Sequence, residues 1–348
     1  MDQYRVFISY SHEDQALTSR IVDVLKENGL TPMWDQDFAY GHGFPEQIKD
    51  FITYSHVFLP VITEAATNRG WVHQEIGYAI ALNVPVLPVM LGTLPSEMIR
   101  ELHGIQLPPD GKGLKSRLST RVFHDLISRY SDASLAPFVC ADLHEDRTIM
   151  MVRYAEDVLR LGATGLIRQK GALSSFHIPD DLITRPIWRL RYGPFPKGDY
   201  HCRLQRSERI ALEKHARQSG CRLILNPDIE YEQYGTRARL VRLETLVRFL
   251  EDMPDDKLQI VFNPEMHQEE SLTIVGSWFA ATSVAASIVQ GYRQTIFTRH
   301  APTMQTRIEL FDRDFDELLQ ASKWSAESSR ARATEELKAK ITVLRETP

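Results

Sequence analysis

Short apolar runs alternate with amphipathic helical periods over the first 130 residues of the chain. The apolar runs are Tyr4–Ser9, Leu30–Trp34, His56–Ile62 and Val84–Leu91. The helical periods are Asp14–Asn28, Pro45–Thr53, Gly70–Leu82 and Ser119–Tyr130. Strands that alternate with helices are typical of βαβ units, in which the strands run parallel and helices cover the sheet. The pattern therefore predicts a parallel α/β domain.

A stretch of small and polar residues follows, and Ser131–Pro137 is predicted to be a linker. It divides the chain into domains at 1–135 and 136–348. Beyond it, the periodicity predicts helices at Arg206–Ser219, Thr236–Asp252, Pro302–Ala321 and Ala326–Leu344. Strands are expected at Arg222–Leu225, Leu258–Phe262, Leu272–Val275 and Gln294–Thr298. Residues 160–200 are broken by glycines and prolines and receive no assignment. We expect a second α/β domain.

Composition narrows the class of protein. With 348 residues, 43% hydrophobic and 25% charged, the chain has the balance of a globular protein. The start lacks a basic segment followed by a long apolar one, so we expect a cytoplasmic protein without membrane contact. Cys140, Cys202 and Cys221 are too few for a disulfide framework or a zinc site and are expected to be reduced thiols.

Charge is unevenly distributed along the chain. The formal net charge of −5 argues against coating of nucleic acid by the whole protein. Residues 147–222 nevertheless carry 15 basic and 7 acidic side chains, and this is the one basic segment. An anionic partner is therefore expected there, if anywhere.

One helix carries a carboxylate at an informative position. Glu75 lies on the border of the predicted buried stripe, between that stripe and two aromatic residues. The stripe consists of Val72, Ile76 and Ala79, and the aromatic residues are Trp71 and Tyr78. From this helix alone, Glu75 is either a solvated surface residue or a desolvated functional acid in an aromatic-walled cleft.

An ordered set of segments resembles the TIR (Toll/interleukin-1 receptor) family. It begins with Tyr4–Ser11 (YRVFISYS) and continues through Gly29-Leu30, Trp34-Asp35, Gly41, Phe44, Ser55 and Trp71–Ile76 (WVHQEI). The resemblance covers about the first 130 residues in order and at the expected separations. It implies a flavodoxin-like, doubly wound parallel sheet for this domain.

The resemblance also implies a function. Many TIR domains, particularly bacterial ones, cleave NAD+, and the glutamate of a W-x-x-x-E helix is their catalytic residue, which corresponds here to Glu75. Cleavage of the nicotinamide–ribose bond develops positive charge on the ribose, which a carboxylate stabilises. We therefore expect an NAD+ glycohydrolase or ADP-ribosyl cyclase that self-associates through its TIR domains, a signalling enzyme of bacterial antiphage defence. The alternatives are a non-enzymatic TIR scaffold or adaptor and an N-glycosidase with another substrate.

The expected NAD+-binding residues surround this glutamate. They are Ser9, Ser11, Trp34, Asp35, Phe38, Gly41 and Trp71. Trp34 is equally consistent with a core residue. The loop 35–44 offers glycines for movement and aromatic rings for stacking on the substrate. No sequence motif of a metal or ATP site is present, and NAD+ is expected as a substrate rather than as a cofactor.

The C-terminal domain shows no catalytic motif, and we expect it to regulate, to sense a ligand or to hold an oligomer. Its arginines either bind an anionic ligand or activator or pair with the acidic TIR surface. They are Arg185, Arg189, Arg191, Arg203, Arg206 and Arg209. Asp312, Asp314 and Asp316 are expected on a solvated helix face.

Overall fold

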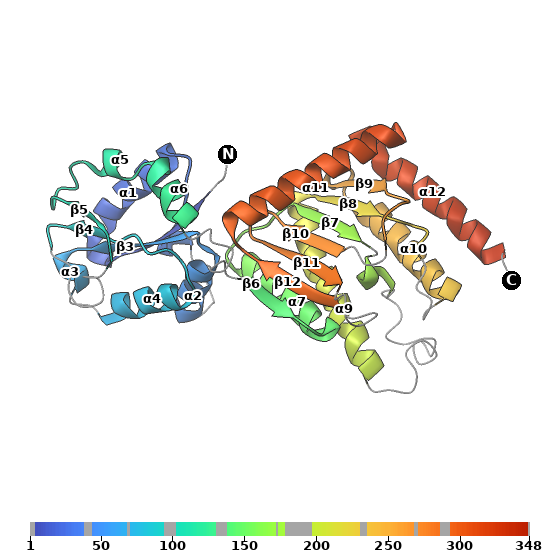
Figure 1. Cartoon of the computed structure of the whole chain (residues 1–348), viewed down its shortest axis with the longest axis horizontal. Helices are drawn as coiled ribbons and strands as arrows, with labels where there is room; N and C mark the ends of the chain where they lie inside the picture. Colours follow the sequence, from blue (N-terminus) through green and yellow to red (C-terminus); the bar gives the residue numbers. More distant parts are fainter. Residues whose placement is uncertain are drawn as a thin grey trace. The chain divides into compact units, whose positions relative to one another are not determined.

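The computed structural model describes residues 4–37, 44–67, 70–93, 102–129, 138–171, 173–177, 197–229, 235–267, 271–285 and 293–346. Its contacts divide the chain into two units (Figure 1). The N-terminal unit is Met1–Pro137 with Arg160–Gly162 and Arg299–Pro302, and the C-terminal unit is the remainder. Among the described residues, no helix is both long enough and apolar enough to cross a bilayer.

The N-terminal unit contains one five-stranded parallel sheet with the order β2-β1-β3-β4-β5. The strands are β1 (Arg5–Ser9), β2 (Thr31–Met33), β3 (Val57–Ile62), β4 (Val89–Leu91) and β5 (Ile105–Leu107). The helices are α1 (Gln15–Glu27), α2 (Phe44–Tyr54), α3 (Glu64–Thr67), α4 (Gly70–Ala81), α5 (Leu114–Arg117) and α6 (Thr120–Arg129). The chain order reverses between β1 and β3, as in flavodoxin-like sheets. The predicted parallel α/β fold is confirmed.

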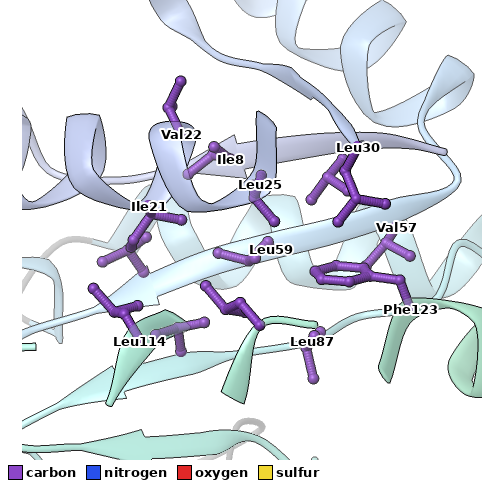
Figure 2. Packing of buried hydrophobic residues seen from close by; sticks show 14 of the residues in the cluster. Ile8, Ile21, Val22, Leu25, Leu30, Val57, Leu59, Leu87, Leu114 and Phe123 are labelled. Carbon is purple, nitrogen blue, oxygen red and sulfur yellow. The ribbon is translucent and has the colours of Figure 1, made fainter. Parts of the chain in front are cut away.

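The two faces of this sheet are covered by different helices. Figure 1 shows α2 and α4 on one face and α1 and α6 on the other. Figure 2 shows Ile8 of β1 packed with Ile21 and Leu25 of α1, and all three are fully buried or nearly so. On the opposite face, the Phe7 ring lies 5.6 Å from that of Phe51 of α2. Because side chains alternate along a strand, Ser9 faces the same side as Phe7, toward α2 and α4.

One predicted strand is much shorter in the structure. The apolar run Val84–Leu91 is a regular strand only over its last three residues. Pro85 and Pro88 lack the N–H group that a strand contributes to its neighbour. Before β4, the chain pairs with β3 through a single bridge between Val86 and Phe58.

The C-terminal unit contains a seven-stranded mixed sheet with the order β6-β12-β11-β10-β7-β8-β9. The strands are β6 (Phe138–Ala141), β7 (Ile167–Gly171), β8 (Cys221–Leu225), β9 (Leu258–Phe262), β10 (Ser271–Val275), β11 (Phe279–Ala285) and β12 (Arg293–Thr298). The helices are α7 (His144–Arg160), α9 (Lys197–Ser219), α10 (Gly235–Asp252), α11 (Ala301–Ser322) and α12 (Ala326–Glu346). β7, β8 and β9 are parallel, and the other pairs are antiparallel.

Helices also cover both faces of this second sheet. Figure 1 shows α11 on one face and α7 and α9 on the other. Phe311 and Phe315 of α11 belong to a buried cluster with Ile274 of β10. From α7, the Tyr154 ring lies 5.5 Å from the ring of Phe279. The sequence pattern did not predict β6, α7, β7 or β11.

Several charged side chains in the described part of the C-terminal unit pair with one another. Both Arg168 and Arg222 bind the Asp312 carboxylate, at 2.7 and 3.0 Å, so the expectation that Asp312 is solvated is wrong. Lys170 lies 3.7 Å from Asp314. Arg147 forms a buried ion pair with Glu208.

The arginines singled out in the sequence differ in their surroundings. Arg209 is buried, with its guanidinium 5.8 Å from the centre of the Phe176 ring, whereas Arg203 is exposed. Burial against an aromatic ring makes Arg209 a packing residue rather than an accessible anion ligand. Arg185, Arg189 and Arg191 lie outside the described residues.

Candidate functional site

The candidate site lies where the chain order of the N-terminal sheet reverses. β1 ends at Ser9, and β3, its parallel neighbour, ends at Ile62. In open α/β sheets, ligands bind outside the carboxyl ends of the strands at this reversal. Ser9 and Ser11 at the end of β1 are therefore at the place where the fold favours a ligand.

Glu75 reaches this region from α4. The helix buries Val72, Ile76 and Ala79 against the sheet, at the spacing of one helical face. Glu75 occupies the same face and is only 8% exposed. Its Oε2 atom is buried and has no hydrogen-bond partner among the described residues. The sequence of the helix is consistent with either a solvated or a desolvated Glu75, and the structure shows a buried carboxyl.

The surroundings of Glu75 change its acidity. Burial raises the pKa of Glu75 from 4.5 to about 7, and the nearby Ser9 hydroxyl offsets part of this rise. The Ser9 oxygen makes no hydrogen bond of standard geometry, so its influence is weak in this structure. None of the cationic side chains that the structure describes contributes to the pKa of Glu75. At neutral pH, this carboxyl is therefore divided between its protonated and ionised forms.

Two hydroxyl groups beside the strand end are also buried without partners. Ser9 is 4% exposed and Ser11 is fully buried, and neither oxygen has a hydrogen-bond partner in the described part of the chain. Leaving a buried polar group unpaired costs about 1–3 kcal/mol. Native structures leave few such groups unpaired, and each calls for an explanation. Together with Oε2 of Glu75, these hydroxyls are buried polar atoms without a partner in the described part of the chain.

Aromatic and acidic side chains that follow β1 and β2 contact one another. The Tyr10 hydroxyl donates a hydrogen bond to Oδ1 of Asp35 at 2.5 Å, and burial and this bond raise the pKa of Tyr10. His12 Nδ1 lies 3.2 Å from Oδ2 of Asp35. The ring centres of Tyr10 and Trp34 are 6.1 Å apart, and the backbone N–H of Trp34 donates a hydrogen bond to the Asp37 carboxylate. Asp35 thus binds protein groups through both oxygens.

The remaining site residues predicted from the sequence are less defined. Trp34 is half-buried and packs against the hydrophobic core, in keeping with its core interpretation. Trp71 is the second residue of α4, but its side chain lies outside what the structure describes. Phe38 and Gly41 lie outside the described residues altogether.

Sequence reasoning missed one polar link at this edge of the sheet. Thr63, directly after β3, donates a hydrogen bond from its hydroxyl to Asp14 at 2.6 Å. The same oxygen accepts one from the backbone N–H of Ala66 at 3.2 Å. The first bond ties the end of β3 to the segment before α1, and the second ties it to α3. The position of Thr63 directly after an apolar run could have identified it from the sequence, because parallel sheets place site residues at the ends of their strands.

Comparison with known proteins identifies the N-terminal region. The sequence model of the family described as "TIR domain" matches residues 6–118. No curated protein matches the chain. In the described part of the chain, no three His, Cys, Asp or Glu side chains are grouped to hold a metal ion.

Two solved structures show weak overall similarity. One is a metazoan TIR-STING receptor from C. gigas in complex with 2',3'-cGAMP, with 16% identity, a TM-score of 0.31 and coverage of 76% of this chain and 91% of that one. The other is TrmBL2, an archaeal chromatin protein that binds DNA, with 8% identity, a TM-score of 0.31 and coverage of 58% of this chain. This chain spans 61% of the TrmBL2 chain. The family model, and not these two structures, identifies residues 6–118 as a TIR domain.

Proposed function

We propose that this chain is a TIR-domain NAD+ glycohydrolase and that Glu75 is its catalytic residue. The observation that carries the proposal is the buried Glu75 carboxyl, which has an unpartnered oxygen and lies near Ser9 at the carboxyl end of β1. A buried carboxyl without a counter-ion lowers the stability of the folded chain. A site that stabilises positive charge in a substrate accounts for this cost.

The reaction follows from the charge on the substrate. The bond between ribose C1′ and the pyridinium nitrogen breaks, and its electron pair neutralises the nicotinamide ring. Positive charge moves to the ribose, where ionised Glu75 stabilises it. Water adds its oxygen to C1′ and loses a proton to the solvent, so the products are nicotinamide, ADP-ribose and H⁺. Because nicotinamide leaves as a neutral molecule, no second carboxyl acid is required.

Other residues of the site bind and orient the substrate in this proposal. The Ser9 and Ser11 hydroxyls donate to ribose or phosphate oxygens, because they have no protein acceptor among the described residues. The Tyr10–Asp35 hydrogen bond holds the loop that carries Trp34. Phe38, Gly41 and Trp71 complete the binding set that the TIR resemblance implies.

We further propose that the C-terminal unit gates this activity by self-association, in an antiphage role. Support for this comes from its separate hydrophobic core and from the absence of a catalytic motif in its sequence. Uncontrolled loss of NAD+ would kill the cell that makes the enzyme, so a gate is needed. Assembly is expected to raise the rate per chain.

Release of nicotinamide from NAD+ by the full chain tests the proposal. Wild type, Glu75→Ala and Glu75→Gln are compared at low and high protein concentration, and nucleosides serve as competing substrates. Glu27→Gln is the matched control, because Glu27 is exposed and pairs with Lys115 at the end of α1. We expect release by wild type and the control and none by the Glu75 variants. Release that persists in Glu75→Gln would contradict the assignment.

Absence of release by wild type at every concentration would favour the TIR scaffold. Cleavage of nucleosides but not of NAD+ would favour the alternative that the chain is an N-glycosidase with another substrate. If specific activity does not depend on protein concentration, the proposed gating by self-association is wrong even where cleavage occurs.

A further inference from the structure

A second feature of Glu75 is that no described side chain neutralises its charge. α4 packs against α2, α3 and β3, and Ser9 of β1 lies nearby. The charged and titratable side chains on these elements are Glu46, Lys49, Asp50 and Tyr54 of α2, Glu64 of α3, Arg5 of β1, and His73 and Tyr78 of α4. β3 has none. Within the described residues, none of them forms an ion pair with Glu75 or affects its acidity.

A buried carboxylate that lacks a counter-ion can persist in two ways. It either takes up a proton, or it receives a positive charge from a bound molecule. The unpartnered Oε2 atom leaves room for a contact of the second kind. Backbone and hydroxyl donors alone would satisfy the oxygen without neutralising its charge, and Ser9 makes no such bond of standard geometry.

We propose that the bound substrate is itself the counter-ion of Glu75, so that the site selects an N-glycoside with a cationic base and releases a proton on binding it. This inference rests on the proposed function and adds how the site distinguishes its substrate. The step is balanced: protonated Glu75 and the cationic ligand give the ionised carboxylate with the cation beside it, and one proton passes to the buffer. The reduced, neutral dihydropyridine form of the same molecule brings no positive charge and binds only to protonated Glu75.

The pH dependence follows from the acidity of the free carboxyl. With a pKa of about 7, Glu75 is about nine-tenths protonated at pH 6 and about one-tenth protonated at pH 8. Binding of the cation therefore releases about 0.9 proton per site at pH 6 and about 0.1 at pH 8. Its affinity rises about tenfold over this range, whereas the affinity of the neutral form falls by a similar factor.

Isothermal titration calorimetry of the full chain tests this inference. The probes are an uncleavable carbocyclic analogue of NAD+ and its reduced form, each titrated at pH 6, 7 and 8 in two buffers of different ionisation enthalpy. The buffer dependence gives the number of protons released. We expect the stated release and opposite pH trends for wild type and for Glu27→Gln. In Glu75→Gln, we expect the difference in proton release between the two analogues to disappear. Their affinities should also no longer change in opposite directions with pH.

Four results would overturn the inference. Equal, parallel pH profiles for the two analogues in wild type would show that the site does not select charge. Charge-selective proton release that persists in Glu75→Gln would assign the proton to another group. Binding of neither analogue would refute both this inference and the proposed function. Nicotinamide release by a chain that binds both analogues without proton exchange would leave the proposed function intact and refute the inference alone.

Discussion

Removing the charge of Glu75 is expected to stabilise the chain while it abolishes the proposed activity. The pKa of Glu75 rises from 4.5 in the unfolded chain to about 7 in the folded one. The folded state thus retains a proton that the unfolded state releases as pH rises through this interval. Stability is therefore full below about pH 4.5, is lost as pH rises to about 7, and stays at the lower level above.

The magnitude follows from the separation of these two pKa values. It corresponds to about 3 kcal/mol of unfolding free energy at pH 8 and roughly 1 kcal/mol at pH 5. Glu75→Gln keeps the shape and polarity of the side chain but cannot ionise. We expect this variant to be more stable than wild type by about these amounts, which raises the melting temperature of the N-terminal unit by roughly 10 °C at pH 8.

Calorimetric unfolding at pH 5 and pH 8 measures the effect, and hydrogen exchange at β1 and β3 assigns the transition to the N-terminal unit. Glu27→Gln is again the control, because an exposed ion pair contributes about 0–1 kcal/mol. Equal melting temperatures of wild type and Glu75→Gln at pH 8 would refute the reasoning. So would a stabilisation of the same size at both pH values, because it would not come from ionisation.

Three further outcomes are expected. Ser9→Ala removes the hydroxyl that lowers the pKa of Glu75, so the pH midpoint of the stability change moves upward, and an unmoved midpoint would exclude the contact. Gly165→Ala places a Cβ 2.5 Å from the backbone nitrogen of Gly276 and should cost about 1–3 kcal/mol in chemical denaturation; a variant as stable as wild type would show that this turn relaxes freely. Burial raises the pKa of Cys221 to about 12, so this thiol should resist iodoacetamide in the native chain and react only after unfolding; rapid native labelling would contradict its burial.

The sequence predicted best those elements whose pattern is local. α1 was expected at 14–28 and is Gln15–Glu27, and β9 was placed at Leu258–Phe262, as in the structure. In α1, helical spacing of apolar residues and a glycine with positive φ after the helix mark both its buried face and its end. Such signals depend on a few neighbouring residues and need no knowledge of the rest of the fold.

The elements that the sequence pattern did not predict have residue patterns that are explained only by the elements packed against them. β7 reads IRQKG, and its Arg168 and Lys170 lie on a sheet because α11 provides Asp312 and Asp314 to pair with them. Polar residues at alternate positions do not predict a buried strand when the paired carboxylates are far along the chain. The same pairing explains why part of the basic segment 147–222 is used within its own unit rather than for a ligand.

For the candidate site, the sequence by itself determined that Glu75 lies on the edge of a helical stripe and that Ser9 ends a strand. Only the tertiary structure decided that both face the same side of the sheet, that Glu75 is buried, and that none of the described cationic side chains accompanies it. The physical reason is that acidity depends on everything within a few ångströms of a group, and those neighbours come from β1, α2 and α3 as well as from α4. A helical period fixes the direction of a side chain, whereas the packing of several elements fixes its solvation and hence its chemistry.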